Sequence, residues 1–98
     1  MTAPRIDEVF GRSERIVGRR IAGEYVLVPL VSRGTDADFI YTLNAVAAAI
    51  WEALDGRASG EAIVQSLVQR FEVDVRQATE DYLGLMETLE SIEAIHRL

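Results

Sequence analysis

The 98-residue chain contains no cysteine, and His96 is its only histidine. Without cysteine, the protein has no disulfide, no thiolate metal site and no cysteine nucleophile. His96 lies in a charged stretch near the end of the chain, where a general base would still need oriented partners. The acidic residues are spread along helix faces instead of clustering at the loop spacing that a calcium site requires. We therefore expect no catalytic residue, no metal site and no cofactor.

Long apolar runs are also missing, since none approaches the roughly 20 residues that a membrane span needs. The first eight residues contain no apolar stretch of the kind found in a secretory signal. Neither of the glycine-rich strings that cradle a phosphate is present. Apolar residues make up 49% of the chain and charged residues 27%, a composition typical of a folded domain and too apolar for a disordered chain. We expect one cytoplasmic domain without membrane contact.

The first half of the sequence predicts short strands. Residues 1–14 show no sustained period of two or 3.6 residues, which predicts a flexible N-terminal segment outside the core and a domain over residues 15–98. The runs 16–21 and 25–30 are rich in β-branched and aromatic residues and predict a hairpin. A polar stretch then leads to a third strand over residues 39–43.

The second half has a helical period. Asn44, Ser59 and Asp74 are good N-caps for three helices, the first ending near Leu54 and the second near Phe71. The third and longest helix places on its apolar face Ala78, Tyr82, Leu85 and Leu89, with Met86 at the edge. Three strands followed by three helices predict an α+β, winged-helix-like fold, with a three-stranded antiparallel sheet followed by a three-helix bundle.

The charge pattern argues against a nucleic-acid partner. The net charge is −6, and all ten basic residues are arginines. Between residues 74 and 93, six acidic residues stand against Arg76 alone, whereas a DNA-reading helix must contact several phosphates. The basic residues Arg15, Arg19 and Arg20 fit either an acidic partner or a solvated strand face.

Two features of the pattern fit peptide binding. Leu83 falls outside the apolar stripe of the third helix, so with Met86 and Thr79 it predicts a small exposed apolar shelf. The alternative is that Leu83 and Met86 pack beneath the sheet or beneath the N-terminal segment. The strand over residues 39–42 has no lysine or proline to guard an open edge, and a peptide can add to such an edge as a further strand. On this interpretation Leu83→Asp weakens peptide binding, and Leu85→Asp unfolds the domain.

Two strings stand out in the second half of the chain: Leu-Asn-x-x-Ala-x-x-Ile-Trp, within the run from Leu43 to Trp51, and Leu-Asp-Gly, from Leu54 to Gly56. They are followed by Leu67, Phe71 to Val73, Asp81, Tyr82, Leu85, Met86 and Leu89. Over about residues 16–95 this pattern resembles the PqqD family, and it also marks the recognition elements of ribosomally made peptide pathways.

The resemblance implies a module that binds the leader segment of a precursor peptide as an added strand, between the third strand and the third helix. The module presents the leader to a tailoring enzyme, which in the namesake pathway of pyrroloquinoline quinone biosynthesis is a radical S-adenosylmethionine protein. Carried over by element, the peptide-binding positions are Phe39, Ile40, Tyr41, Thr42, Arg76, Thr79, Tyr82, Leu83 and Met86.

Two stretches depart from the family pattern. After the third helix the family usually has a glycine before an apolar pair, where this chain has Glu93, so the helix is expected to run on and its exit to differ. Residues 31–38 add a polar excursion before the third strand. The pathway stays open between quinone biosynthesis and systems such as lasso or sactipeptide clusters. The alternative functions are a winged-helix transcriptional regulator and a structural subunit or assembly factor of a modifying enzyme, and the open strand edge also admits a homodimer.

Overall fold

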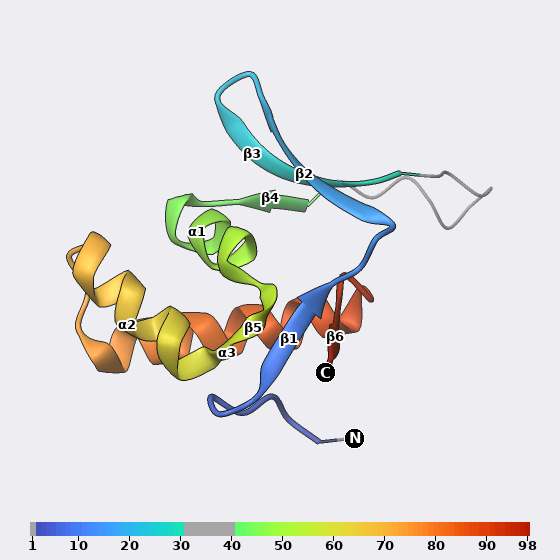
Figure 1. The fold of residues 1–98 in the computed structure, drawn as a ribbon. Coiled ribbons are helices and arrows are strands. Elements are labelled where there is room, and N and C mark those ends of the chain that lie inside the picture. The colour runs from blue at the N-terminus through green and yellow to red at the C-terminus, as the bar shows by residue number, and fades with distance from the viewer. Residues whose placement is uncertain (1, 31–40) are drawn as a thin grey trace.

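The computed structural model describes residues 2–30 and 41–98, which form three helices and two three-stranded antiparallel sheets (Figure 1). The predicted α+β class is therefore confirmed. In chain order the elements are β1 (Val9–Arg12), β2 (Ile16–Ile21), β3 (Glu24–Pro29), β4 (Tyr41–Leu43), α1 (Ala45–Ala53), β5 (Asp55–Ser59), α2 (Gly60–Arg70), α3 (Val75–Ser91) and β6 (Ile95–Arg97).

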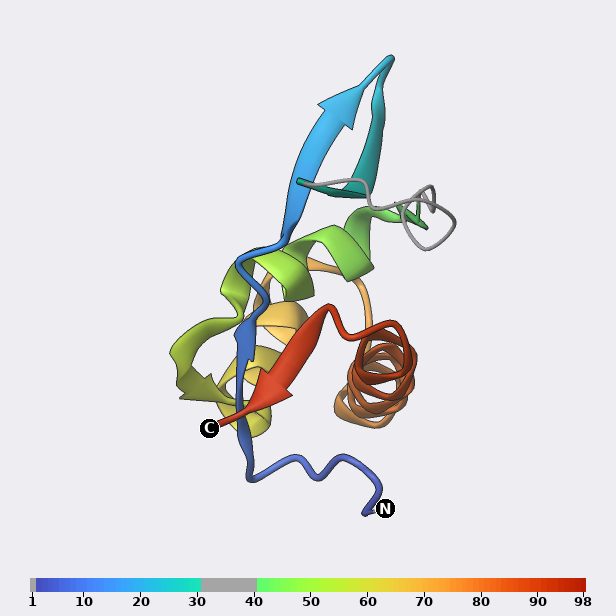
Figure 2. The same cartoon turned by 90° about the vertical axis from the view of Figure 1, so that its right-hand side faces the viewer.

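The first sheet has the strand order β2-β3-β4 and matches the predicted three-stranded sheet. Its hairpin turns at Ala22 and Gly23, which both have positive φ, at 52° and 85°. Two consecutive positive φ values are what a tight two-residue hairpin turn requires. The β2–β3 hairpin projects from the helices on the side of α1 (Figure 2). Val26 of β3 lies opposite Thr42 of β4, so β4 forms one border of this sheet.

The second sheet, with the order β5-β1-β6, was not predicted. Its central strand β1 comes from the segment that the sequence placed outside the core, and Phe10 on β1 is fully buried. The prediction for residues 1–14 is therefore wrong for β1, because a strand of four residues is too short to show a period. The guanidinium of Arg97 on β6 donates to Glu8 and to Glu90, each at 2.9 Å, and so connects β6 to the N-terminal segment and to α3.

The helices begin where the sequence predicts. The side chains of Asn44, Ser59 and Asp74 accept hydrogen bonds from backbone N–H groups three residues later, at 2.8, 3.3 and 2.8 Å. Such caps satisfy N–H groups that have no partner inside the helix. At the other end of α3, Glu93 takes a left-handed conformation with φ of 59°, which stops the helix before β6. Among the described residues, no helix has the length and apolar character needed to cross a membrane.

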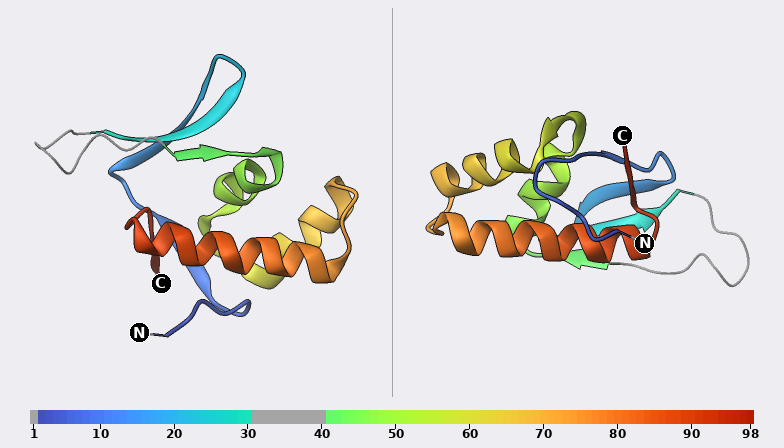
Figure 3. Two further views of the ribbon diagram at one scale, coloured as in Figure 1. Left: turned by 180° about the vertical axis from the view of Figure 1, so that it is seen from behind. Right: turned by 90° about the horizontal axis from the view of Figure 1, so that it is seen from below.

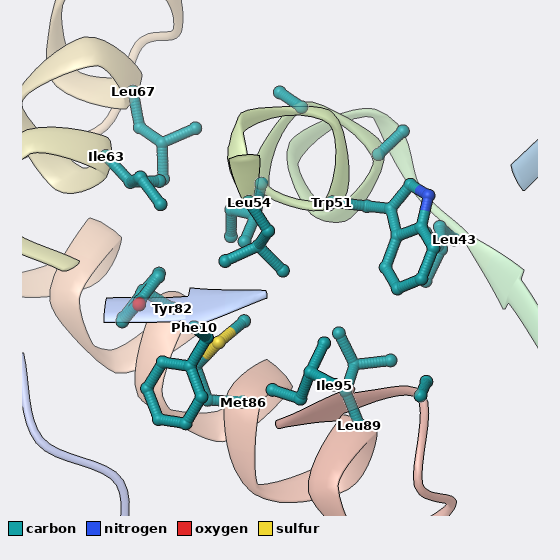
Figure 4. Close-up of a cluster of buried hydrophobic side chains, with 14 of the residues drawn as sticks. Phe10, Leu43, Trp51, Leu54, Ile63, Leu67, Tyr82, Met86, Leu89 and Ile95 are labelled. Atoms are coloured by element: carbon teal, nitrogen blue, oxygen red, sulfur yellow. The ribbon is translucent and has the colours of Figure 1, made fainter. Parts of the chain in front are cut away.

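The core lies between the helices and the two sheets (Figure 4). Trp51 of α1, Tyr82 of α3 and Phe10 of β1 are its largest fully buried side chains. On α3 the buried residues are Ala78, Tyr82, Met86 and Leu89. Met86 thus takes the core position that the helical period predicts for Leu85, and Leu85 is only partly buried.

Candidate functional site

The strand β4 has a free edge. It pairs with β3 on one side, and among the described residues no strand pairs with its other side. Alternate N–H and C=O groups of an antiparallel edge strand point away from its partner, so they can bond to another extended chain. The edge of β4 is therefore a template for an added strand.

A groove of about 410 Å³ runs beside this edge. Seen from behind, β4 and α3 form its two sides and α1 lies between them (Figure 3). The lining residues are Tyr41, Thr42, Leu43 and Asn44 from β4 and its exit, Val46, Ala47 and Ile50 from α1, and Glu80, Asp81, Gly84, Leu85 and Thr88 from α3.

The groove has an apolar floor and an acidic border. Ile50 is fully buried at the floor, and Leu85 is partly buried along the α3 side. Glu80 and Asp81 stand on α3 at the border, and the side-chain amide of Gln77 donates to Asp81 at 2.8 Å. This border disfavours a carboxylate-bearing ligand through like-charge repulsion. The groove therefore suits an extended segment that is apolar and not acidic.

The structure brings only part of the predicted site together. Tyr41 and Thr42 line the groove, whereas Phe39 and Ile40 lie outside the described residues. Arg76 is exposed and does not line the groove, but it forms an ion pair at 3.5 Å with Glu80, which does.

The remaining predicted residues of α3 do not line the groove. Thr79 and Leu83 lie on the other flank of the helix, and Leu83 packs against the core. Tyr82 and Met86 are both 0% exposed. The prediction that Met86 belongs to an exposed shelf is therefore wrong, and the alternative, that Leu83 and Met86 pack inward, describes the structure.

Tyr82 packs on the side of the core away from the groove. A Cβ atom built on Gly60 would lie 2.6 Å from the Tyr82 ring and 2.6 Å from the Ile6 carbonyl oxygen. The Tyr82 hydroxyl has no hydrogen-bond partner among the described residues. Burial, with a smaller contribution from the negative charge of Glu8, raises the pKa of Tyr82 to about 12. Tyr82 is therefore a neutral core residue and not a peptide contact.

The groove side of α3 was missed by sequence reasoning. The residues that α3 contributes to the lining are Glu80, Asp81, Gly84, Leu85 and Thr88. Periodicity places Leu85 on the apolar face and Met86 at its edge, so it assigned Leu85 to the core and hid the groove side. The signal that could have found this side is Gly84, a glycine in the interior of the longest helix.

An open strand edge above an apolar floor is the arrangement by which small domains bind extended peptides. The chain belongs to the PqqD family, since the family described as coenzyme PQQ synthesis protein D matches residues 24–95. The resemblance predicted from the motifs is thereby confirmed.

The fold is also similar to that of TbiB1 in its solved complex with the TbiA(beta) leader peptide. The two chains share 26% sequence identity with a TM-score of 0.70, over 88% of this chain and 94% of TbiB1. No curated protein sequence matches the chain.

Proposed function

We propose that this chain binds the leader segment of a ribosomally synthesised precursor peptide and presents it to a modifying enzyme, without catalysing a reaction itself. The observation that carries the proposal is the open edge of β4 beside the groove between β4, α1 and α3. Membership of the PqqD family and the likeness to TbiB1, which was solved with a leader peptide, support it.

Strand addition explains how such a groove recognises a peptide. The three residues of β4 span roughly 10 Å, which is long enough for main-chain hydrogen bonds to hold a short extended segment in a fixed register. Alternate side chains of the added strand then point toward α1 and α3. Main-chain bonds supply affinity for any extended segment, and the groove supplies the selection among sequences.

The choice of β4 over β2, the other outer strand of the same sheet, follows from charge. The outer strand β2 also has no second partner among the described residues, but it carries exposed Arg19 and Arg20. Charged side chains on an edge strand discourage pairing with another chain. The sequence of β4 is Tyr-Thr-Leu, without a charge, so β4 is the edge that accepts a peptide.

Leader binding raises the effective concentration of the core peptide at the active site of the modifying enzyme. A leader held by this chain, while the chain itself rests on the enzyme, keeps the attached core peptide close to the active site. The enzyme is a radical S-adenosylmethionine protein if the pathway is quinone biosynthesis, or the tailoring enzyme of another peptide-modification pathway.

Fluorescence anisotropy with labelled leader peptides tests the proposal. The peptides are synthetic copies of the leaders encoded beside the gene of this chain, titrated at low and at high salt. We expect saturable binding that changes little with salt, because strand addition over an apolar floor involves few charges. Trp51 is unsuitable as the probe, since it is buried beside Gly18 and Tyr25 and does not line the groove.

Two outcomes contradict the proposal. Affinity that falls steeply with rising salt, and that extends to double-stranded DNA, indicates a nucleic-acid ligand. No binding of any leader, with the modifying enzyme absent and then present, together with a stoichiometric complex between chain and enzyme, indicates a structural subunit.

A further inference from the structure

Gly84 lies on the exposed side of α3, where neither its backbone conformation nor the packing of the described residues requires glycine. Its φ is not in the positive range that favours glycine. A Cβ atom built on Gly84 meets no described atom within 4 Å, apart from the local backbone of α3. Glycine within a helix is less stable than alanine because its backbone loses more freedom on folding. Gly84 therefore lowers the stability of α3 without a packing reason inside the described chain.

Other glycines of the chain show the contrast. A Cβ atom on Gly18 would lie 2.4 Å from the Tyr25 hydroxyl, and one on Gly60 would lie 2.6 Å from the Tyr82 ring. Core packing excludes a side chain at both positions. Gly84 has no such neighbour, so packing among the described residues does not exclude a side chain there.

The space at Gly84 opens into the groove. Gly84 lines the groove together with Asp81, Leu85 and Thr88. The Thr88 hydroxyl donates to the Gly84 carbonyl oxygen at 3.2 Å, so this side chain turns back onto its own helix. The side of the groove formed by α3 is thus indented at Gly84, opposite the free edge of β4.

We propose that Gly84 forms a notch that admits one large apolar side chain of the bound leader strand. The inference rests on the proposed function, because the notch lies in the same groove. An added strand sits about 4.8 Å from β4 and alternates its side chains between the two faces of the sheet. A side chain on the helix-facing side enters the indentation, with Ile50 and Leu85 as its apolar contacts.

The chemistry of the notch defines the class of leader. Ile50 and Leu85 supply its apolar contacts, Glu80 and Asp81 stand one turn of α3 before it, and Thr88 stands one turn after it. A large aliphatic or aromatic side chain fits this environment, whereas a glutamate or aspartate at the same position is repelled. The groove therefore selects leaders that carry a bulky apolar residue and no acidic residue at the notch position.

Gly84→Ala and Gly84→Leu test the notch by moving stability and affinity in opposite directions. We expect Gly84→Ala to raise Tm by about 2–8 °C and to weaken binding of the labelled leader by about fivefold or more, because the methyl group occupies the notch. Gly84→Leu should abolish saturable binding. The control is Ser91→Leu, which places a leucine at an exposed position of α3 outside the groove lining and should keep full affinity.

A double-mutant cycle identifies the notch residue of the leader. Each apolar leader residue is changed to alanine and titrated against the wild-type chain and against Gly84→Ala. At one leader position, the change to alanine should reduce affinity clearly less in the Gly84→Ala background than in wild type, because the contact of that residue is already impaired there.

The notch is overturned, and the proposed function stands, if wild type and Gly84→Ala bind every leader variant alike. A lower Tm of Gly84→Ala shows that glycine serves the fold and overturns the notch too, whereas a wild-type chain that binds no leader overturns notch and proposed function together.

Discussion

Leu83 and Leu85 are two partly buried leucines that lie on opposite flanks of α3. Only Leu85 lines the groove beside β4. Since the two residues have the same size and share one helix, they form a matched pair for separating peptide contact from helix stability.

Leu85→Ser should weaken leader binding about tenfold, because it removes most of an apolar side chain from the groove. Leu83→Ser should leave the affinity within about twofold. Both variants should keep the helical circular-dichroism signal, since each leucine is only partly buried. Anisotropy titrations of the two variants check this expectation, and equal losses of affinity would contradict the assignment of the groove to the Leu85 flank.

Tyr82 gives a pH dependence at the residue scale. Its pKa is raised from 10.0 to about 12 by burial and by the charge of Glu8. The unfolded chain therefore loses this proton at a lower pH than the folded chain does, and the free energy of unfolding falls as pH rises from 10 toward 12.

Tyr82→Phe should remove this part of the alkaline loss of stability. It also removes a buried hydroxyl that has no hydrogen-bond partner in the described part of the chain, so we expect it to raise the free energy of unfolding at neutral pH by roughly 1 kcal/mol. Urea unfolding of both proteins at neutral pH and at pH steps above 10 measures the difference. If the free energy of unfolding falls equally with pH in wild type and in Tyr82→Phe above pH 10, the raised pKa of Tyr82 is refuted.

At the scale of elements, β1 connects the N-terminal segment to the two strands β5 and β6 of the helical half of the chain. It pairs with β5 on one side and with β6 on the other. The segment before it also contributes, because the carbonyl oxygens of Ile6 and Glu8 accept hydrogen bonds from the N–H groups of Glu61 and Gly60 at 2.9 and 3.1 Å. The start of α2 therefore depends on residues far earlier in the chain.

Phe10→Ala should lower the free energy of unfolding by about 3–5 kcal/mol, because it leaves a cavity in the core. A loss of this size is a large part of the stability of a small domain. Val17→Ala on the exposed hairpin is a suitable control and should cost far less, since Val17 is only partly buried. Thermal unfolding of both variants compares the two positions, and a Phe10→Ala protein as stable as the control would mean that β1 is dispensable.

At the scale of the whole molecule, charge is separated along the chain. Four arginines, Arg12, Arg15, Arg19 and Arg20, are exposed on or beside β1 and β2. The helical half is acidic, and the groove border with Glu80 and Asp81 belongs to it. The four arginines do not outweigh the net charge of −6 of the whole chain. Double-stranded DNA should therefore not be retained saturably in a gel-shift assay with this chain, even at low salt.

The sequence determines the local features of this protein. The three N-caps, the hairpin turn and the family motifs each depend on residues within a few positions of one another, so they can be read without a structure. The peptide-binding hypothesis also follows from the sequence, because the PqqD motifs and the uncharged strand β4 can be recognised from consecutive residues.

Only the tertiary structure decided which flank of α3 faces the groove. At 100° per residue, local spacing places Leu85 inside the apolar stripe and Met86 at its edge, the reverse of what the structure shows. The rotation of the helix is set by what covers it, and Met86 is buried in the cluster that contains Phe10 of β1. Since β1 is distant in sequence and too short to show a period, no local pattern could reveal that Leu85, Gly84 and Asp81 line the site while Met86 and Tyr82 fill the core.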